Sequence, residues 1–167
     1  GLCRRLRRGS EPAAAEACSK KLEKMGRIMT KVGFIGCGNM AQAIIGGIIK
    51  NGTVKAADIM ASDVFEDGLI KANAEHGIKI TTDNAEVAGQ SDLIFIAVKP
   101  HQASGVIKEI AAKVTAKKLV ASIAAGIDLK SMEGWFGKKV KLVRLMPNTP
   151  ALVNAGMTGA SPNASVT

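Results

Sequence analysis

Aromatic residues are scarce in this chain of 167 residues, where they make up 3% of the sequence, with one Trp and no Tyr. A hydrophobic core must therefore be built from aliphatic side chains and methionine. The same scarcity argues against a nucleic-acid surface, because such sites combine basic residues with aromatic side chains on which bases stack. We therefore expect no nucleic-acid partner.

Cysteines and long apolar runs are also few. The three cysteines, Cys3, Cys18 and Cys37, are an odd number without regular spacing, which argues against a disulfide framework or a zinc site. This pattern favours a reducing compartment, and we expect a cytoplasmic protein. Uninterrupted apolar runs such as residues 93–98 fall far short of the roughly 18 residues that a membrane span needs, so no membrane partner is expected.

Positive charge is concentrated at the amino terminus. Residues 1–28 hold eight Lys and Arg and three Glu, and so carry more than half of the net charge of +9. No strand pattern occurs there, and we interpret the stretch as a basic, disordered extension. Its origin stays open between upstream sequence foreign to the natural protein, a partly helical extension and a transit peptide, against which the glutamates argue. One domain is expected over residues 29–167.

A glycine turn at residues 36–41, with the sequence GCGNMA, lies between a strand-like apolar run at 32–35 and an apolar segment with helical spacing. It fits the pattern G-x-G-x-x-G/A of dinucleotide-binding βαβ units. Gly36 would allow the sharp turn, Gly38 would let a pyrophosphate approach the backbone, and Ala41 would allow close helix packing. The helix N-terminus would offer free N–H groups to phosphates.

Strand-like and helix-like segments alternate along the rest of the chain. The expected strands are residues 32–35, 58–62, 78–81, 92–98, 118–124 and 140–146, with a short one near 157–160. The expected helices are residues 39–50, 65–76, 83–90, 100 to about 114, and 128–136. This alternation predicts an α/β fold with a Rossmann-type, doubly wound and mostly parallel sheet. Such sheets bind ligands at the carboxyl ends of their strands, so the loops after the strands are the candidate site.

Asp63 ends the second expected strand. An acidic residue there can hydrogen-bond the adenosine ribose of NAD and repel the 2′-phosphate of NADP. Asp63 could equally be the N-cap of the helix that follows, and the two roles are compatible. No Arg lies beside it to receive a phosphate, so the position physically favours NAD.

Three further residues could carry chemistry. Cys37 fills the variable place between two glycines, so its backbone is expected to matter more than its thiol, although a helix N-terminus lowers a thiol pKa. We expect His101 to face solvent in the first turn of a helix rather than to transfer protons, and Lys99 to reach the cofactor or be solvated. No nucleophile–base pair, carboxylate pair or metal cluster can be assembled, so the catalytic residues are left unassigned.

Four motifs together resemble those of pyrroline-5-carboxylate reductases. They occur in that family's order and spacing: GFIGCGNMA at 33–41, AVKP at 97–100, SIAAG at 122–126 and RLMPNTP at 144–150. The resemblance covers about residues 31 to 167. It implies NAD(P)H-dependent reduction of 1-pyrroline-5-carboxylate to L-proline, the last step of proline synthesis.

The resemblance also implies roles for individual residues. The pyrophosphate would lie against Cys37, Asn39 and Met40, and the adenosine end of the cofactor against Asp63 and Asn84. The nicotinamide half would lie along Val98, Lys99, Ala125, Asn148 and Thr149. The family more often prefers NADPH and has a small polar residue at or next to the position of Asp63, so the choice between NADP and NAD stays open.

Length is the main departure from the family, which has a second, helical domain of roughly 100 residues. That domain forms the dimer and supplies most of the substrate pocket. We therefore expect this chain to be the cofactor-binding portion, with little turnover alone, and a homo-oligomer only together with the missing domain. Two alternatives stay open: a nucleotide-binding module without turnover, and a hydroxy-acid-type dehydrogenase, against which the turn at residues 147–150 argues.

Overall fold

The computed structural model describes residues 30–147 and 158–166. The strands are β1 (Val32–Ile35), β2 (Ile59–Ser62), β3 (Lys79–Thr81), β4 (Leu93–Ile96), β5 (Leu119–Ser122), β6 (Lys141–Pro147) and β7 (Thr158–Pro162). The helices are α2 (Asn39–Lys50), α3 (Glu66–His76), α4 (Asn84–Gln90), α5 (Pro100–Ile110) and α6 (Leu129–Phe136), with a short 3-10 helix, η1 (Ala56–Asp58), before β2.

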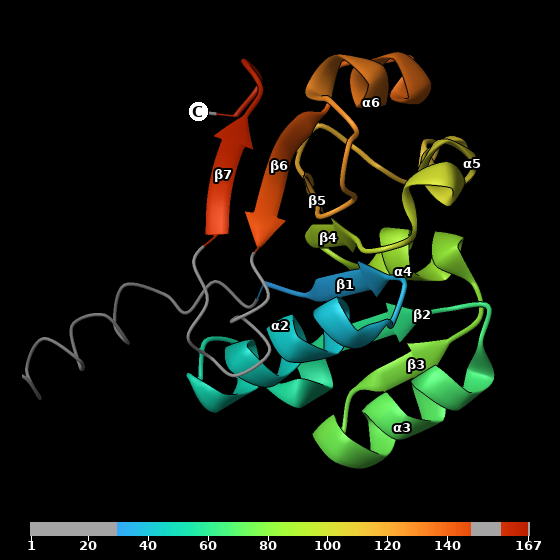
Figure 1. Ribbon diagram of the computed structural model, residues 1–167, viewed down its shortest axis with the longest axis vertical. Helices are drawn as coiled ribbons and strands as arrows, with labels where there is room; N and C mark the ends of the chain where they lie inside the picture. Colours follow the sequence, from blue (N-terminus) through green and yellow to red (C-terminus); the bar gives the residue numbers. More distant parts are fainter. Residues whose placement is uncertain (1–29, 148–157, 167) are drawn as a thin grey trace, which may run out of the picture.

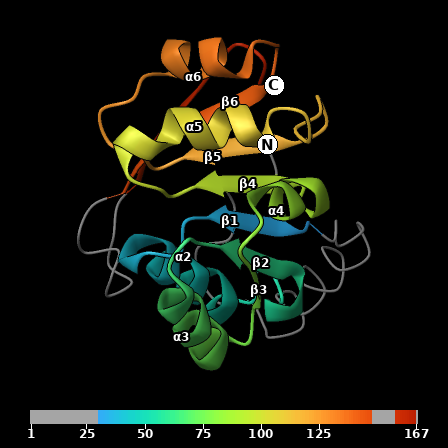
Figure 2. The ribbon, with the colours of Figure 1, turned by 90° about the vertical axis from the view of Figure 1, so that its right-hand side faces the viewer.

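These strands form one sheet in the order β3-β2-β1-β4-β5-β6-β7. All neighbouring pairs are parallel except β6 and β7, which are antiparallel. Figure 1 shows β7 and β3 at opposite edges, and Figure 2 shows the strands from β6 to β3 stacked in this order. The chain builds outward from β1 through β2 to β3 and then returns to place β4 on the other side of β1. The point where the winding reverses therefore lies between β1 and β4.

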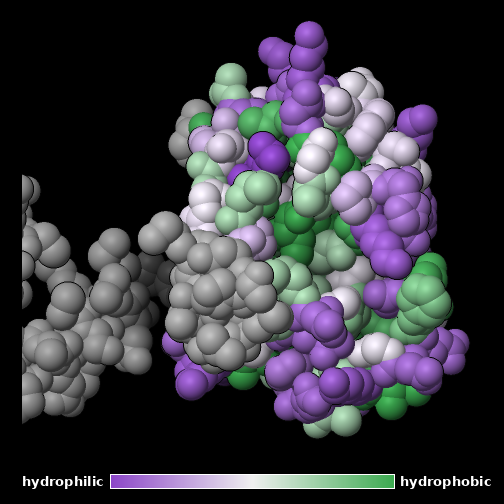
Figure 3. All heavy atoms as spheres, viewed as in Figure 1, coloured by the Kyte–Doolittle hydropathy of each residue, from purple (hydrophilic) through white to green (hydrophobic). Residues whose placement is uncertain are grey.

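Helices cover both faces of the sheet, which explains why its central strands are apolar on both sides. On one face Ile45 of α2 and Leu69 of α3 are buried in one hydrophobic cluster, and on the other Ile107 of α5 and Met132 of α6 are buried in another. Phe34 and Phe95, on the adjacent strands β1 and β4, stack with ring centroids 4.7 Å apart. The face in Figure 3 is mostly hydrophilic at its margins, with apolar side chains visible towards its centre.

The predicted Rossmann-type α/β fold is confirmed, and β1 and α2 have the predicted bounds. Helix α5 was expected to reach about residue 114 but ends at Ile110. Val114 lies beyond the helix end and is nevertheless fully buried, so the apolar spacing continues past it. Pro147, predicted to begin a turn, is the last residue of β6 and pairs with Thr158. The extension at residues 1–28 and the turn residues 148–150 lie outside the described residues.

Polar contacts at helix ends fix how the helices meet the sheet. Asp83 and Asp128, the first residues of the helices expected at 83–90 and 128–136, are the N-caps of α4 and α6. The other end of α4 is held by Lys118, just before β5. Its ammonium group donates to the carbonyl oxygens of Ala88, Gly89 and Ser91 at 2.7, 2.8 and 2.7 Å. Lys118 thus satisfies helix-end carbonyls that lack intrahelical partners and ties α4 to β5.

We expect Lys118→Met to lower the free energy of unfolding by about 1–3 kcal/mol, because three hydrogen bonds from a charged donor are lost. Equilibrium unfolding in urea measures the change. The matched control is Lys117→Met at the exposed neighbouring residue, for which a change within about 0.5 kcal/mol is expected. Equal effects of the two substitutions would show that the contacts to α4 add nothing to stability.

Candidate functional site

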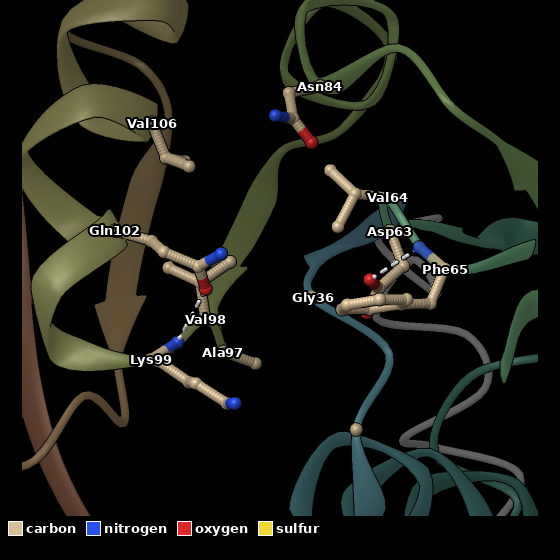
Figure 4. A pocket seen from close by; sticks show the side chains of 11 residues that line it. Gly36, Asp63, Val64, Phe65, Asn84, Ala97, Val98, Lys99, Gln102 and Val106 are labelled. Carbon is tan, nitrogen blue, oxygen red and sulfur yellow. Dashed lines mark hydrogen bonds between the residues drawn. The ribbon is translucent and has the colours of Figure 1, made fainter.

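A cavity of about 200 Å³ opens at the carboxyl ends of β1, β2 and β4. In Figure 4, Asp63 and Phe65 face Gln102 and Val106 of α5 across it. The full lining is Gly36, Gly38, Asp63, Val64, Phe65, Asn84, Ala97, Val98, Lys99, Gln102 and Val106. Since the winding of the sheet reverses between β1 and β4, the cavity lies at the switch point, where ligands of such sheets bind.

Gly36, directly after β1, lies against the residues that follow β4. Its φ is +97°, and a Cβ there would lie 2.6 Å from the carbonyl oxygen of Ala97 and 2.9 Å from the nitrogen of Val98. Its N–H donates to the carbonyl oxygen of Ser62 at 2.8 Å, which ties the turn to β2 as well. Backbone conformation and space both therefore require glycine at position 36.

Gly38 is a glycine for a different reason. Its φ of −73° is ordinary for any residue, and a Cβ there would meet no atom of the described residues within 4 Å. Packing thus does not require glycine at this place, although Gly38 lines the cavity. A missing side chain in open space beside a cavity is what close approach of a ligand to the backbone needs.

The N-terminus of α2 begins directly after Gly38. The first hydrogen bond across this end joins the Gln42 N–H to the Gly38 carbonyl at 3.0 Å, and no side chain of residues 30–147 or 158–166 caps the helix. The N–H groups of Asn39, Met40 and Ala41 precede that bond and have no acceptor within the helix. Free N–H groups at the positive end of a helix dipole suit a phosphate, so this region fits the pyrophosphate of a dinucleotide.

Asp63 hydrogen-bonds to the backbone of the glycine turn and does not cap the helix that follows it. Its Oδ2 accepts the N–H of Cys37 at 2.7 Å, and its Oδ1 accepts the N–H of Phe65 at 3.0 Å. The suggestion that Asp63 is the N-cap of α3 is wrong, because Phe65 takes that place without a side-chain bond. An ionised carboxylate has about four acceptor sites, so two remain for ribose hydroxyls.

Asn84, the first residue of α4, contributes a side chain that is held on two sides. Its Oδ1 accepts the hydroxyl of Ser62 at 2.7 Å, and its Nδ2 donates to Oε2 of Glu109 at 3.0 Å. The half-buried amide therefore joins the ends of β2, α4 and α5 where it lines the cavity.

The thiol of Cys37 is less reactive than a solvent-exposed thiol, whereas a helix N-terminus would make it more reactive. Its side chain is 2% exposed, and burial, with the Asp63 carboxylate as a second cause, raises its pKa from 9.0 to about 11. Lowering by the helix dipole is thus outweighed, and the alternative of an oxidation-sensitive thiol is not supported. Only the backbone of Cys37 takes part in the turn, as its position between two glycines predicted.

Only some of the other residues predicted to lie near a cofactor line the cavity. Val98 and Lys99 line the cavity, and the Lys99 N–H donates to Oε1 of Gln102 at 3.3 Å.

Three other predicted residues do not line the cavity. Asn39 and Met40 lie in the first turn of α2, and Ala125 is exposed in the turn after β5. Asn148 and Thr149 lie outside the described residues. His101 is exposed in the first turn of α5, as expected.

Five lining residues were not identified as site residues from the sequence: Val64, Phe65, Ala97, Gln102 and Val106. Val64 and Phe65 are 72% and 71% exposed, and an apolar pair directly after Asp63 in a polar loop was the available signal. Gln102 and Val106 share a face of α5, but only the tertiary structure brings that face to Asp63. Among residues 30–147 and 158–166, no group of His, Cys, Asp and Glu is arranged to hold a metal ion, and no helix is long and apolar enough to cross a membrane.

We expect the folded protein to protect Cys37 from alkylation. A pKa about two units higher leaves roughly a hundredfold less thiolate at pH 8, and burial slows access further. In a variant carrying Cys3→Ser and Cys18→Ser, iodoacetamide at pH 8 should modify the native protein at least about 100-fold more slowly than the protein in urea, in line with the thiolate deficit. Similar rates in the two conditions would contradict the buried environment.

Three comparisons relate this geometry to known proteins. Residues 31–126 match the family described as NADP oxidoreductase coenzyme F420-dependent. The pyrroline-5-carboxylate reductase of Escherichia coli (strain K12) is 45% identical over 137 residues, which cover 82% of this chain and 51% of that protein. The chain thus spans about half the length of the curated relatives that it matches.

Solved structures agree with the sequence relatives. A pyrroline-5-carboxylate reductase from Coxiella burnetii shares 38% identity with a TM-score of 0.80, over 83% of this chain and 52% of that one. The Plasmodium falciparum pyrroline carboxylate reductase, solved with NADP bound, shares 30% identity with a TM-score of 0.74, over 83% of this chain and 50% of that one. Because the family match covers more than half of its residues, the chain belongs to the NADP oxidoreductase coenzyme F420-dependent family, and the resemblance to pyrroline-5-carboxylate reductases is confirmed.

Proposed function

We propose that this chain is the cofactor-binding portion of a pyrroline-5-carboxylate reductase and that it holds NADH or NADPH at the carboxyl ends of β1, β2 and β4. The observation that carries the proposal is Gly38, whose missing side chain leaves open space beside a helix N-terminus that no described side chain caps. The fold does not require a glycine there, and a dinucleotide does.

In this proposal each segment of the site has its own task. The N–H groups of the first turn of α2, at Asn39 and Met40, bind the pyrophosphate, while Gly36 and the Cys37 backbone shape the turn. Asp63 and Asn84 lie at the adenosine end. The nicotinamide half lies along Val98, Lys99, Ala125, Asn148 and Thr149.

The reaction of the whole protein is the reduction of 1-pyrroline-5-carboxylate to L-proline. When bound, the reduced nicotinamide supplies the hydride for the imine carbon, so the protein's part is to bind and orient the reactants. Lys99, the one cation among the described residues that line the cavity, is exposed at its edge. No catalytic residue is assigned within this chain.

The proposal extends to the setting of the protein. Residues 29–167 would act as one NAD(P)-binding unit with a small-molecule substrate and without a nucleic-acid partner. We place the protein in the cytoplasm, because its cysteine usage suits a reducing compartment. Assembly into a homo-oligomer would depend on the part of the relatives that this chain does not span.

Gly38→Ala tests the cofactor site without disturbing the fold. The new methyl group enters open space, so the melting temperature should stay within about 3 °C, whereas the dissociation constants of NADH and NADPH should rise on the order of tenfold. Isothermal titration calorimetry measures the binding. Gly134→Ala, at an equally open position in α6, is the matched control and should leave binding unchanged. Unaltered binding in Gly38→Ala would refute this site.

Turnover separates an enzyme portion from a nucleotide-binding module. We expect the chain to bind NADH or NADPH and to oxidise either one with pyrroline-5-carboxylate at less than about a hundredth of a typical kcat of roughly 10 s⁻¹. The fall in nicotinamide absorbance during steady-state assays measures the rate. Turnover near the typical value would show that this chain is sufficient for catalysis.

A further inference from the structure

Glu109 does not line the cavity itself but contacts one of its lining residues from the outside. It is an exposed residue of α5 whose carboxylate oxygen lies 3.0 Å from Nδ2 of the cavity residue Asn84. On its other side the Asn84 amide accepts the hydroxyl of Ser62, the residue just before Asp63. A second carboxylate is thereby positioned next to the end of the cavity that Asp63 borders.

The charges around the cavity are unevenly distributed. Among the described lining residues Lys99 is the only cation, and Figure 4 shows it at the opposite end from Asn84. Asp63 lines the cavity directly, and Glu109 contacts the wall at Asn84. Asp63 and Glu109 therefore place two carboxylates along or directly behind the cavity wall, and among the described lining residues no Lys or Arg lies beside Asn84 to offset them.

We propose that Glu109 is a positioning and specificity residue that, together with Asp63, makes the pocket favour a dinucleotide with free ribose hydroxyls over one with a 2′-phosphate. The inference rests on the proposed function, in which this cavity holds the adenosine end of the cofactor. Asp63 keeps acceptor sites for hydroxyl donors, whereas a phosphate offers it mainly negative charge. Carboxylates within several ångströms of a phosphate repel it, and salt weakens the repulsion.

Glu109 has two separable effects. Its negative charge acts on a phosphate at a distance, and its hydrogen bond fixes the Asn84 amide with Nδ2 towards α5 and Oδ1 towards β2. Glu109→Gln retains an acceptor for Asn84 and removes only the charge. Glu109→Ala removes both, and so reports on the positioning of Asn84 as well.

The test uses two probes that lack nicotinamide, ADP-ribose and 2′-phospho-ADP-ribose, titrated into the full chain by calorimetry. We expect the wild-type protein to bind ADP-ribose at least about fivefold more tightly, and Glu109→Gln to reduce that ratio about threefold by strengthening binding of the phosphorylated probe. Raising the salt concentration should narrow the wild-type ratio and change the Glu109→Gln ratio less. Glu109→Ala should in addition weaken the binding of ADP-ribose itself.

Asp58→Asn is the matched control. Asp58 directly precedes β2, at the end opposite Asp63, and a separation of five strand residues corresponds to roughly 16 Å. This substitution removes the same charge from the protein and should leave the ratio unchanged.

The possible outcomes distinguish the two proposals. Equal or tighter binding of the phosphorylated probe by the wild-type protein would overturn the specificity inference and leave the cofactor site standing. An unchanged ratio in Glu109→Gln, or an equal change in Asp58→Asn, would overturn the role of Glu109. Failure of both probes, and of NADH and NADPH, to bind would refute the proposed function itself.

Discussion

The structure depends on a close approach at Gly36, where the end of β1 meets the end of β4 without space for a side chain. The Ala97 N–H donates to the carbonyl oxygen of Ile35 at 2.8 Å, so the two strands stay joined up to this point. Gly36 then turns the chain out of the sheet, and α2 begins three residues later. A bulkier residue would push β1 and β4 apart and would displace the N-terminus of α2 from the cavity.

The polar groups around the cavity are held in place by hydrogen bonds within the protein. Asp63 binds the backbone on both sides of its own loop, and Asn84 is held between Ser62 and Glu109. Such groups lose little further freedom on binding, which lowers its entropic cost. A substitution of Asp63 would therefore change two things at once: it would remove a carboxylate from the cavity and release the Cys37 N–H of the glycine turn.

Local sequence predicted the elements where a local cause sets them. The bounds of α2 follow from a glycine turn before it and apolar spacing within it, and Asp83 and Asp128 cap helices by bonds within two or three residues. The wrong expectation about Asp63 involves a contact over a long distance in the chain. Asp63 binds Cys37, 26 residues away, instead of capping α3, and the same pair helps raise the thiol pKa.

The sequence by itself determined the fold class, the glycine turn and the resemblance to a reductase family, because each is written in spacing along a continuous stretch. Only the tertiary structure decided which side chains share the cavity. Gln102 and Val106 face Asp63 because α5 follows β4, which the reversed winding places beside β1. Glu109 reaches Asn84 across 25 residues for the same reason. Residue spacing along the chain does not predict such contacts, because the order of strands in the sheet differs from their order in the chain.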